Sequence, residues 1–351
     1  MNLKDLPIQQ RVEWLLNEAQ VYCERFSHPD LSAARRRYVQ EHPSPILVTA
    51  CIDGRVNLAH AMQSPPGLMK FLRNIGPQLT MKRMDFASHV DSHISAAAAL
   101  GQGSLIMVTY HFSGSHTHLG CAAYGCDTEL ARQDCFQVAE HIRQTYVSHA
   151  FPVYPLVCGF DTDIEALLIH GADGQSLNLS DPELNADSLG VWLNRLHPHL
   201  PENLAQDFLP LLQGNVNHAA ELRATERGIA LEHCEWAICV GNGFEFIRTP
   251  NVAMVIGPYS PDMGKPVSTA ARVVARNMQK GRIPEDGALL LSCCLYNDGL
   301  VEKATAEFRS RLSADLAENI IAHTEPELTR RLTRLSAIFN VEKRSLELLH
   351  P

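Results

Sequence analysis

The sequence ILVTACIDGR, residues 46–55, joins a continuous apolar, β-branched run to a short polar segment. An apolar run of this length without alternation is typical of a strand that is buried on both faces of a parallel sheet. The polar segment follows the carboxyl end of this strand, where open α/β sheets place their sites. The first fold class to consider is therefore α/β, with Cys51, Asp53 and Arg55 as candidate functional residues.

The segments on either side alternate between helical and strand patterns. Strands are expected at residues 46–52, 104–112 and 152–171. Helices are expected at residues 7–41, 58–62, 68–72, 93–100 and 122–148. This alternation predicts a mostly parallel α/β sheet with flanking helices, preceded by an N-terminal helical segment.

The second half repeats the first in the order of its elements. EWAICVGNGFEF (235–246) matches ILVTACIDGRVNL (46–58), with Asn-Gly where the first copy has Asp-Gly. The tripeptide Ile-Gly-Pro recurs, an alanine-bearing helix follows each copy, and ALLLSCCLYNDG (288–299) repeats SLIMVTYHFSG (104–114). This shared order indicates an internal duplication. Two similar but unrelated lobes are the less favoured interpretation.

Length and composition narrow the classes of protein. The chain has 351 residues, of which 45% are hydrophobic and 20% charged, values that suit a globular protein with two domains. The formal charge is −9 and basic residues form no long run, so nucleic acid is not an expected partner. The sequence shows no signal-peptide core and no apolar stretch that would span a bilayer. We expect no membrane span and a cytoplasmic location, where the 10 cysteines stay reduced.

Two of these cysteines occupy positions suited to a metal. Cys51 ends the first buried strand, and Cys121, in HTHLGCAAYG (116–125), opens the helix expected at 122–148. A helix N-terminus favours the thiolate form that binds metal. Two thiolates and one histidine leave the fourth tetrahedral position on Zn²⁺ open to water, which marks a catalytic rather than a structural site. Zn²⁺ is therefore the expected cofactor.

The motifs resemble, in order, those of the β-class carbonic anhydrases. That family combines CIDGR (51–55) at a strand end, RNIG (73–76), a Ser/Ala-rich helix, an apolar strand and a His…Cys pair. The duplicated layout, GCAAYG (120–125) and GFDTD (159–163) are most similar to the carboxysomal shell branch, which has one active site in a duplicated domain. The resemblance implies an enzyme, a carbonate dehydratase of the lyase class, that reversibly hydrates carbon dioxide to bicarbonate by zinc-bound hydroxide.

Two criteria select different histidines as the third ligand. The family motif His-x-x-Cys selects His118, whereas the family's strand-end position selects His111 and makes SGSHTHLG (113–120) an insertion. We prefer His111, because a rigid strand constrains metal geometry better than a loop does. The predicted ligands are Cys51, His111 and Cys121, with His118 as the alternative to His111.

The resemblance also assigns roles to Asp53 and Arg55. It implies that Asp53 orients the zinc-bound water while the bidentate fork of Arg55 keeps that carboxylate off the metal. Both are predicted catalytic residues. The second half lacks such groups, so one zinc per chain is expected. Its matching positions hold Val240, Asn242, Phe244 and Tyr296.

These inferences divide the chain into four parts. They are an N-terminal helical arm (1–43), a zinc-binding catalytic domain (44–175), a helical connection (176–230) and a degenerate repeat without metal ligands (231–351). The resemblance implies a longer N-terminal region than residues 1–43, which makes carboxysome association doubtful. A homo-oligomer is compatible with the sequence.

Two other functions fit the same motifs. One is a non-catalytic zinc-binding protein of this fold that acts in assembly or regulation. The other is a related zinc hydrolase that acts on another small substrate, such as carbonyl sulfide or carbon disulfide.

Overall fold

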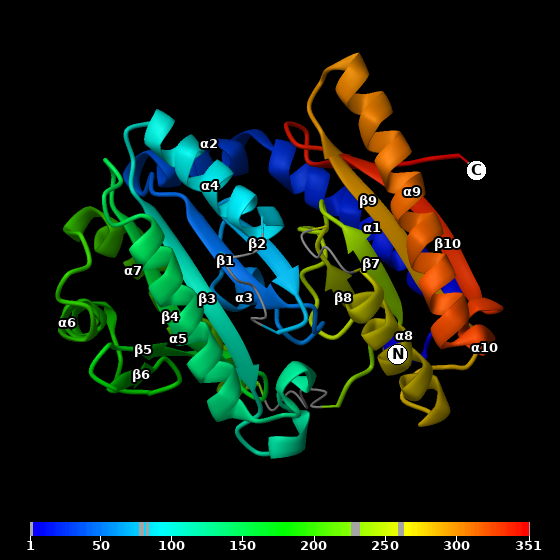
Figure 1. Cartoon of the computed structure of the whole chain (residues 1–351), viewed down its shortest axis with the longest axis horizontal. Coiled ribbons are helices and arrows are strands. Elements are labelled where there is room, and N and C mark those ends of the chain that lie inside the picture. The colour runs from blue at the N-terminus through cyan, green and yellow to red at the C-terminus, as the bar shows by residue number, and fades with distance from the viewer. Residues whose placement is uncertain (1–2, 77–80, 82–83, 226–231, 259–262, 351) are drawn as a thin grey trace. The chain divides into compact units, whose positions relative to one another are not determined.

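The computed structural model describes residues 3–76, 81, 84–225, 232–258 and 263–350 (Figure 1). The last residues of the predicted connection, 226–230, lie outside the described residues. Contacts group the chain into two units. The first-half unit comprises Ala34–Cys51 and Val56–Leu231, and the second-half unit comprises Met1–Ala33, Ile52–Arg55 and Glu232–Pro351. The segment with Asp53 and Arg55 thus belongs with the second half, although it follows β1 directly in the chain.

The first-half unit is built on a six-stranded sheet with the order β2-β1-β3-β4-β5-β6. The strands β1 to β4 run parallel, and β5 and β6 are antiparallel additions at one edge. Their bounds are Ile46–Cys51 (β1), Met69–Asn74 (β2), Ser104–Phe112 (β3), Val153–Asp161 (β4), Ala166–His170 (β5) and Ser176–Asn178 (β6).

Helices cover this sheet and extend beyond it. The long helix α5 packs on β3 and β4, and α7 packs on β5, α3 and α6 (Figure 1). Asp127 caps α5 by accepting a hydrogen bond from the Leu130 amide at 3.0 Å. The helices are α3 (Leu58–Ala61), α4 (Met84–Ala99), α5 (Thr128–Thr145), α6 (Ala186–Leu196) and α7 (Glu202–Ala224), with 3₁₀ helices η2 (Thr117–Leu119) and η3 (Ala122–Tyr124).

The second-half unit is built on a five-stranded sheet with the order β11-β10-β9-β7-β8. The strands are β7 (Ala237–Gly241), β8 (Ala253–Ile256), β9 (Ala288–Tyr296), β10 (Leu332–Asn340) and β11 (Ser345–Leu348), of which only β11 is antiparallel to its neighbour among the described strands. The helices are η1 (Leu3–Asp5), α1 (Ile8–Ser27), α8 (Gly264–Gln279), α9 (Leu300–Thr324) and α10 (Pro326–Thr329), while α2 (Pro29–Glu41) crosses the sequence boundary of the two units.

The two sheets share one topology. Reading β8-β7-β9-β10-β11 against β2-β1-β3-β4-β5 gives the same chain order, with four parallel strands followed by one antiparallel strand in each. The predicted fold class is confirmed: mostly parallel sheets with flanking helices, present twice and preceded by N-terminal helices.

Five expected elements differ from the structure. The helix expected at 93–100 begins earlier, at Met84, and the strand expected at 152–171 is two antiparallel strands, β4 and β5. The helix expected at 7–41 is two helices, because His28 has extended backbone before Pro29. Residues 68–72, expected as helix, belong largely to β2, where pairing with the buried β1 outweighs local pattern. The helix expected from Ala122 begins only at Thr128, because Gly125 and Cys126 have left-handed backbone. Cys121 therefore precedes a three-residue 3₁₀ helix and gains little from a helix dipole.

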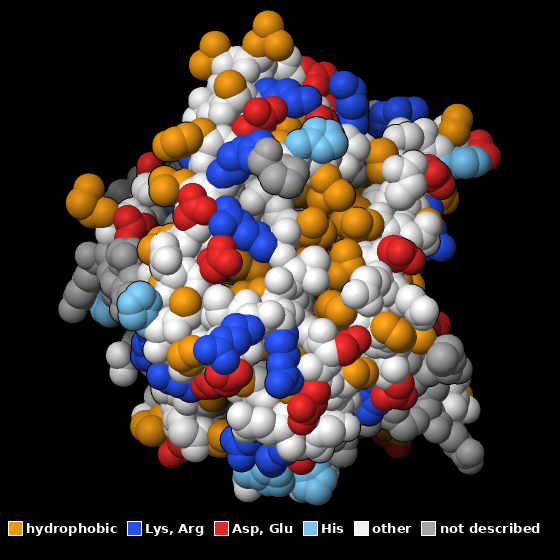
Figure 2. All heavy atoms as spheres, turned by 90° about the vertical axis from the view of Figure 1, so that its right-hand side faces the viewer, with side chains coloured by type: hydrophobic (Ala, Val, Ile, Leu, Met, Phe, Trp, Pro, Cys, Tyr) orange, Lys and Arg blue, Asp and Glu red, His pale blue; other side chains and the backbone are white. Residues whose placement is uncertain are grey.

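The helix α9 is apolar on more than one face. Small residues such as Ala306 and Ala314 are buried toward β9 and β10. Figure 2 shows hydrophobic side chains at the surface on the side of the molecule that bears this helix. Its exposed large residues are Leu300, Val301, Phe308, Leu312 and Leu316. In the described part of the chain, no helix is both long enough and apolar enough to cross a membrane.

Candidate metal centre

Three side chains suited to zinc converge at the carboxyl ends of β1 and β3. Cys51 is the last residue of β1, His111 the last but one of β3, and Cys121 lies just before η3. One ligand atom from each, two sulfurs and an imidazole nitrogen, lies within 4.8 Å of the others. All three residues are buried, with exposed fractions of 7%, 1% and 3%. Two thiols and an imidazole at this spacing fit Zn²⁺ and leave its fourth position open.

The alternative ligand His118 lies elsewhere. It is an exposed residue of η2, and its backbone carbonyl accepts a hydrogen bond from the Cys126 thiol at 3.3 Å. Among the described residues, His118 belongs to no group of potential ligands, whereas His111 joins both cysteines. Proximity favours His111, and the ligand assignment stays a prediction.

Two aspartates of the GFDTD segment shape the loop between His111 and Cys121. The Asp163 carboxylate accepts hydrogen bonds from the Ser113 hydroxyl at 2.9 Å and from the Ser115 amide at 2.7 Å. Asp161 accepts a hydrogen bond from the Gly114 amide at 3.2 Å. Burial alone would raise the pKa of Asp163, but the bonds from Ser115 and Ser113 lower it below its ordinary value. The loop is thus held in shape by charge-assisted bonds despite its exposed residues.

The RNIG segment supports the centre from β2. Arg73 donates to the backbone carbonyls of Cys51 at 2.9 Å and of Val56 at 2.8 Å, so one guanidinium holds both ends of the polar segment. Gly76 has a φ of +57°, and a Cβ there would lie 3.0 Å from the Cys121 sulfur. The segment therefore needs an arginine and a glycine for separate physical reasons.

Asp53 and Arg55 form the bidentate pair that the sequence predicts. The Arg55 Nε atom donates to one carboxylate oxygen at 3.0 Å and its terminal nitrogen to the other at 2.6 Å. The Arg55 amide also donates to Asp53 at 2.9 Å. Both side chains are at most 6% exposed, so the pair is far better protected from solvent than a surface ion pair.

Sequence reasoning missed two residues beside this pair. His233 Nε2 lies 3.8 Å from the Asp53 carboxylate, and His233 Nδ1 lies 3.0 Å from both oxygens of the buried Glu235. Glu235 also accepts a hydrogen bond from the Gly54 amide at 3.1 Å. Burial alone would lower the pKa of His233, but the charges of Glu235 and Asp53 together raise it. The signal that could have found them is a charged Glu235 placed next to the apolar run of β7.

Other cysteines of the chain have the character of buried apolar residues. Burial raises the pKa of Cys158 to about 12 and raises that of Cys135 and Cys293 as well. Thiols of this kind pack as hydrophobes rather than bind metal.

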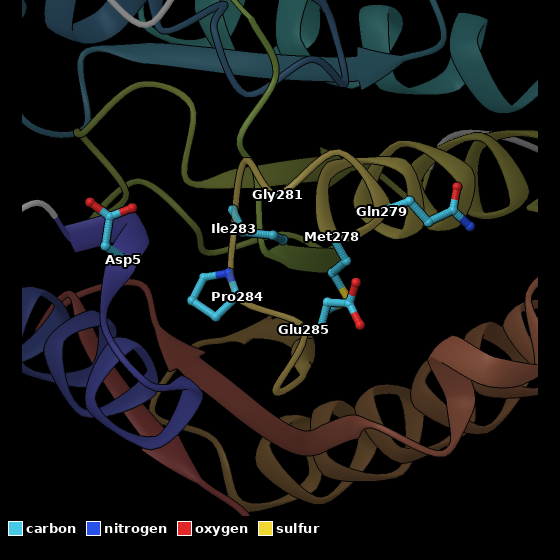
Figure 3. Close-up of a pocket in the computed structure, with 7 residues that line it drawn as sticks. All are labelled: Asp5, Met278, Gln279, Gly281, Ile283, Pro284 and Glu285. Carbon is cyan, nitrogen blue, oxygen red and sulfur yellow. The ribbon is translucent and has the colours of Figure 1, made fainter.

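Figure 3 shows a pocket of the second-half unit that has a different character. It is lined by Asp5, Met278, Gln279, Gly281, Ile283, Pro284 and Glu285. With two carboxylates and neither histidine nor cysteine, this lining offers no zinc site comparable to the one at Cys51.

The family model and the sequence relatives that match this chain carry the same name, carboxysome shell carbonic anhydrase. A family model for the catalytic domain of carboxysome shell carbonic anhydrase matches residues 82–190, a range that includes His111 and Cys121. The carboxysome shell carbonic anhydrase of Prochlorococcus marinus (strain MIT 9313) is 25% identical over 62% of this chain and 49% of its own length. The carboxysome shell carbonic anhydrase of Hydrogenovibrio crunogenus (strain DSM 25203 / XCL-2) is 24% identical over 63% of this chain and 48% of its own length. The chain spans about half the length of these relatives.

Two solved structures of carbonic anhydrases also match. The β-carbonic anhydrase CcaA is 15% identical over 51% of this chain and 94% of its own, with a TM-score of 0.33. The carbonic anhydrase from Streptococcus mutans is 20% identical over 42% of this chain and 95% of its own, with a TM-score of 0.23. By the family model and the sequence relatives, the chain is similar to the carboxysome shell carbonic anhydrases.

Proposed function

We propose that this chain is a zinc-dependent carbonic anhydrase that interconverts carbon dioxide and bicarbonate. The observation that carries the proposal is the convergence of Cys51, His111 and Cys121 at the ends of two parallel strands. The names of the sequence relatives support the same activity. When bound at this centre, zinc would supply Lewis-acid chemistry and lower the pKa of water.

Five residues of the chain have separate roles in the proposed reaction. Cys51, His111 and Cys121 would hold the metal. Asp53, two residues after Cys51, would accept a hydrogen bond from the reacting water and orient it. Arg55 occupies both oxygens of Asp53 and would keep this carboxylate from becoming a fourth ligand.

His233 adds a route for the proton that hydration releases. Its side chain is 22% exposed, so it can exchange protons with solvent while Nε2 faces Asp53. Glu235 fixes the ring by accepting from Nδ1. A raised pKa suits a group that must take up a proton near neutral pH.

Stopped-flow assay of carbon dioxide hydration tests the activity, on protein whose zinc content has been measured. We expect hydration that disappears in a Cys51→Ser variant. Zinc-loaded wild-type protein without hydration would overturn the proposal and favour a non-catalytic zinc protein. Parallel assays with carbonyl sulfide and carbon disulfide distinguish the related hydrolases.

The proposal includes a cytoplasmic location and, on the names of the relatives alone, carboxysome association. Sedimentation of the full chain with purified carboxysome shells tests the association: recovery in the shell fraction supports it, and recovery in the supernatant alone contradicts it.

A further inference from the structure

A second group of metal-binding side chains lies within the first-half unit. His60 comes from α3, Glu165 from the turn before β5, and His218 from α7. One ligand atom from each lies within 4.8 Å of the others. Glu165 and His218 are buried, with exposed fractions of 7% and 6%, and His60 is partly buried. We propose that these three residues form a second divalent-metal site, whose ligand set suits Zn²⁺.

The contacts between the three side chains match this use. His218 Nε2 donates to a Glu165 carboxylate oxygen at 2.7 Å. The rings of His60 and His218 meet edge to face, with centroids 5.0 Å apart. On tetrahedral zinc with bonds of about 2.0–2.1 Å, two ligand atoms lie about 3.3 Å apart. The metal would replace the proton on Nε2, and the two ligand atoms would move apart by about 0.6 Å.

One buried asparagine locks the three ligand-bearing elements together. Asn215, one turn before His218 on α7, is fully buried. Its amide nitrogen donates to the carbonyls of Ala61 at 3.0 Å and of Glu165 at 2.9 Å. Its oxygen accepts from the Leu167 amide at 2.8 Å. The backbone beside His60 and that of Glu165 are therefore fixed to α7, as a preformed site requires.

Close packing of α3 on α7 has a further cause. Gly214 touches the end of α3 so closely that a Cβ would lie 2.3 Å from the Met62 carbonyl oxygen. Only glycine permits this approach, which brings His60 to His218.

The backbone conformation of Glu165 gives separate support for the site. Its φ of +50° is in the left-handed region, which costs a non-glycine residue about 1 kcal/mol or more. A simple His218–Glu165 ion pair accounts for two members of the group. It does not account for the third donor, His60, or for the strained turn that presents the carboxylate.

The consequence would be structural. His60 follows the CIDGR segment closely in the chain, so a metal held there would tie α3 to α7. The second site adds one zinc to the single zinc expected at Cys51, His111 and Cys121. It leaves the proposed reaction unchanged.

Zinc content of the full chain tests the site, measured by mass spectrometry after equilibrium dialysis against buffered zinc. We expect two equivalents for wild type and for the control His199→Ala, which removes an exposed histidine. His60→Ala, Glu165→Gln and Cys121→Ala should each retain one, and His60→Ala/Cys121→Ala none. One equivalent in wild type, or two in His60→Ala, would overturn the site.

A second measurement does not depend on variants of the cluster. In a Cys51→Ala/Cys121→Ala protein, added zinc should raise the midpoint of thermal unfolding, because it binds the folded state at His60. Cobalt bound to this protein should show d–d absorption without the thiolate charge-transfer band of the cysteine centre. Absence of both the shift and the cobalt spectrum would contradict the proposal.

Discussion

Gly76 makes room for the thiol of Cys121. A Cβ on Gly76 would lie 3.0 Å from the Cys121 sulfur and 2.9 Å from the Ala123 Cβ. The glycine of the RNIG motif therefore supports the metal centre because it has no side chain to displace the Cys121 sulfur. The contact links β2 to the loop that carries the last predicted ligand.

This contact predicts that Gly76→Ala weakens zinc binding at the cysteine centre by about tenfold or more, because the new methyl displaces Cys121. Gly101→Ala is the matched control. Gly101 also has a left-handed backbone, with a φ of +71°, but a Cβ there meets nothing within 4 Å. Both variants carry a similar backbone cost of about 1 kcal/mol. Competition with a chelator measures the affinity, and equal affinities in the two variants would refute the role of Gly76.

The choice between His111 and His118 as the third ligand can also be tested by substitution. We expect His111→Ala to lose the zinc of the cysteine centre on dialysis, because the ring lies with both thiols. His118→Ala should keep it, because that residue is exposed in η2. The thiolate charge-transfer band of the cobalt-substituted protein reports this centre specifically. A band lost in His118→Ala but kept in His111→Ala would reverse the assignment.

His233→Gln should slow hydration by roughly 10-fold to 100-fold in dilute buffer, because the proton acceptor beside Asp53 is lost. Added imidazole should restore much of the rate, and zinc content should not change. His42→Gln is the matched control, since His42 is 24% exposed and lies 3.6 Å from the carboxylate of Asp207. A His233→Gln protein with the wild-type rate at every buffer concentration would exclude the shuttle.

Acid should destabilise the first-half unit through buried histidines. Burial lowers the pKa of His93, His170 and His197 to about 4, well below the ordinary 6.5. As the pH falls, these histidines take up protons in the unfolded chain at a higher pH than in the folded chain. The stability that each neutral ring provides is therefore fully present above pH 6.5. It is lost as the pH falls toward 4, by at most about 3 kcal/mol for each histidine.

Urea unfolding between pH 7 and pH 4.5, with a chelator present so that zinc release does not contribute, measures this loss. His170→Phe should show a shallower dependence on pH, while the exposed His199→Phe should match wild type. A free energy of unfolding that is constant from pH 7 to pH 4.5 would contradict the explanation.

The sequence was sufficient for features that depend on one segment at a time. The apolar runs that end at Cys51 and His111 are local patterns, and they predicted parallel strands whose ends meet. The strand-end criterion also selected the histidine that lies beside the cysteines. The shared order of elements in the two halves predicted the repeated topology.

The features that sequence reasoning missed depend on contacts between distant segments. Residues 69–72 form a strand because the pairing of β2 with β1 outweighs their local pattern. His233 and Glu235 reach Asp53 through the folding of the second-half unit. The group of His60, Glu165 and His218 requires the packing of α3 on α7. No spacing within a single segment encodes these contacts.

The central claim is that the predicted zinc centre is catalytic, and Arg55→Ala tests it most directly. The measurement is stopped-flow hydration of carbon dioxide by zinc-loaded Arg55→Ala, wild type and the control Arg132→Ala, which breaks an exposed bidentate pair with Glu129. We expect Arg55→Ala to keep its zinc but to lose roughly 100-fold or more in rate, because the released Asp53 can bind the metal. The control should match wild type. A folded, zinc-loaded Arg55→Ala protein with the wild-type rate would contradict the account.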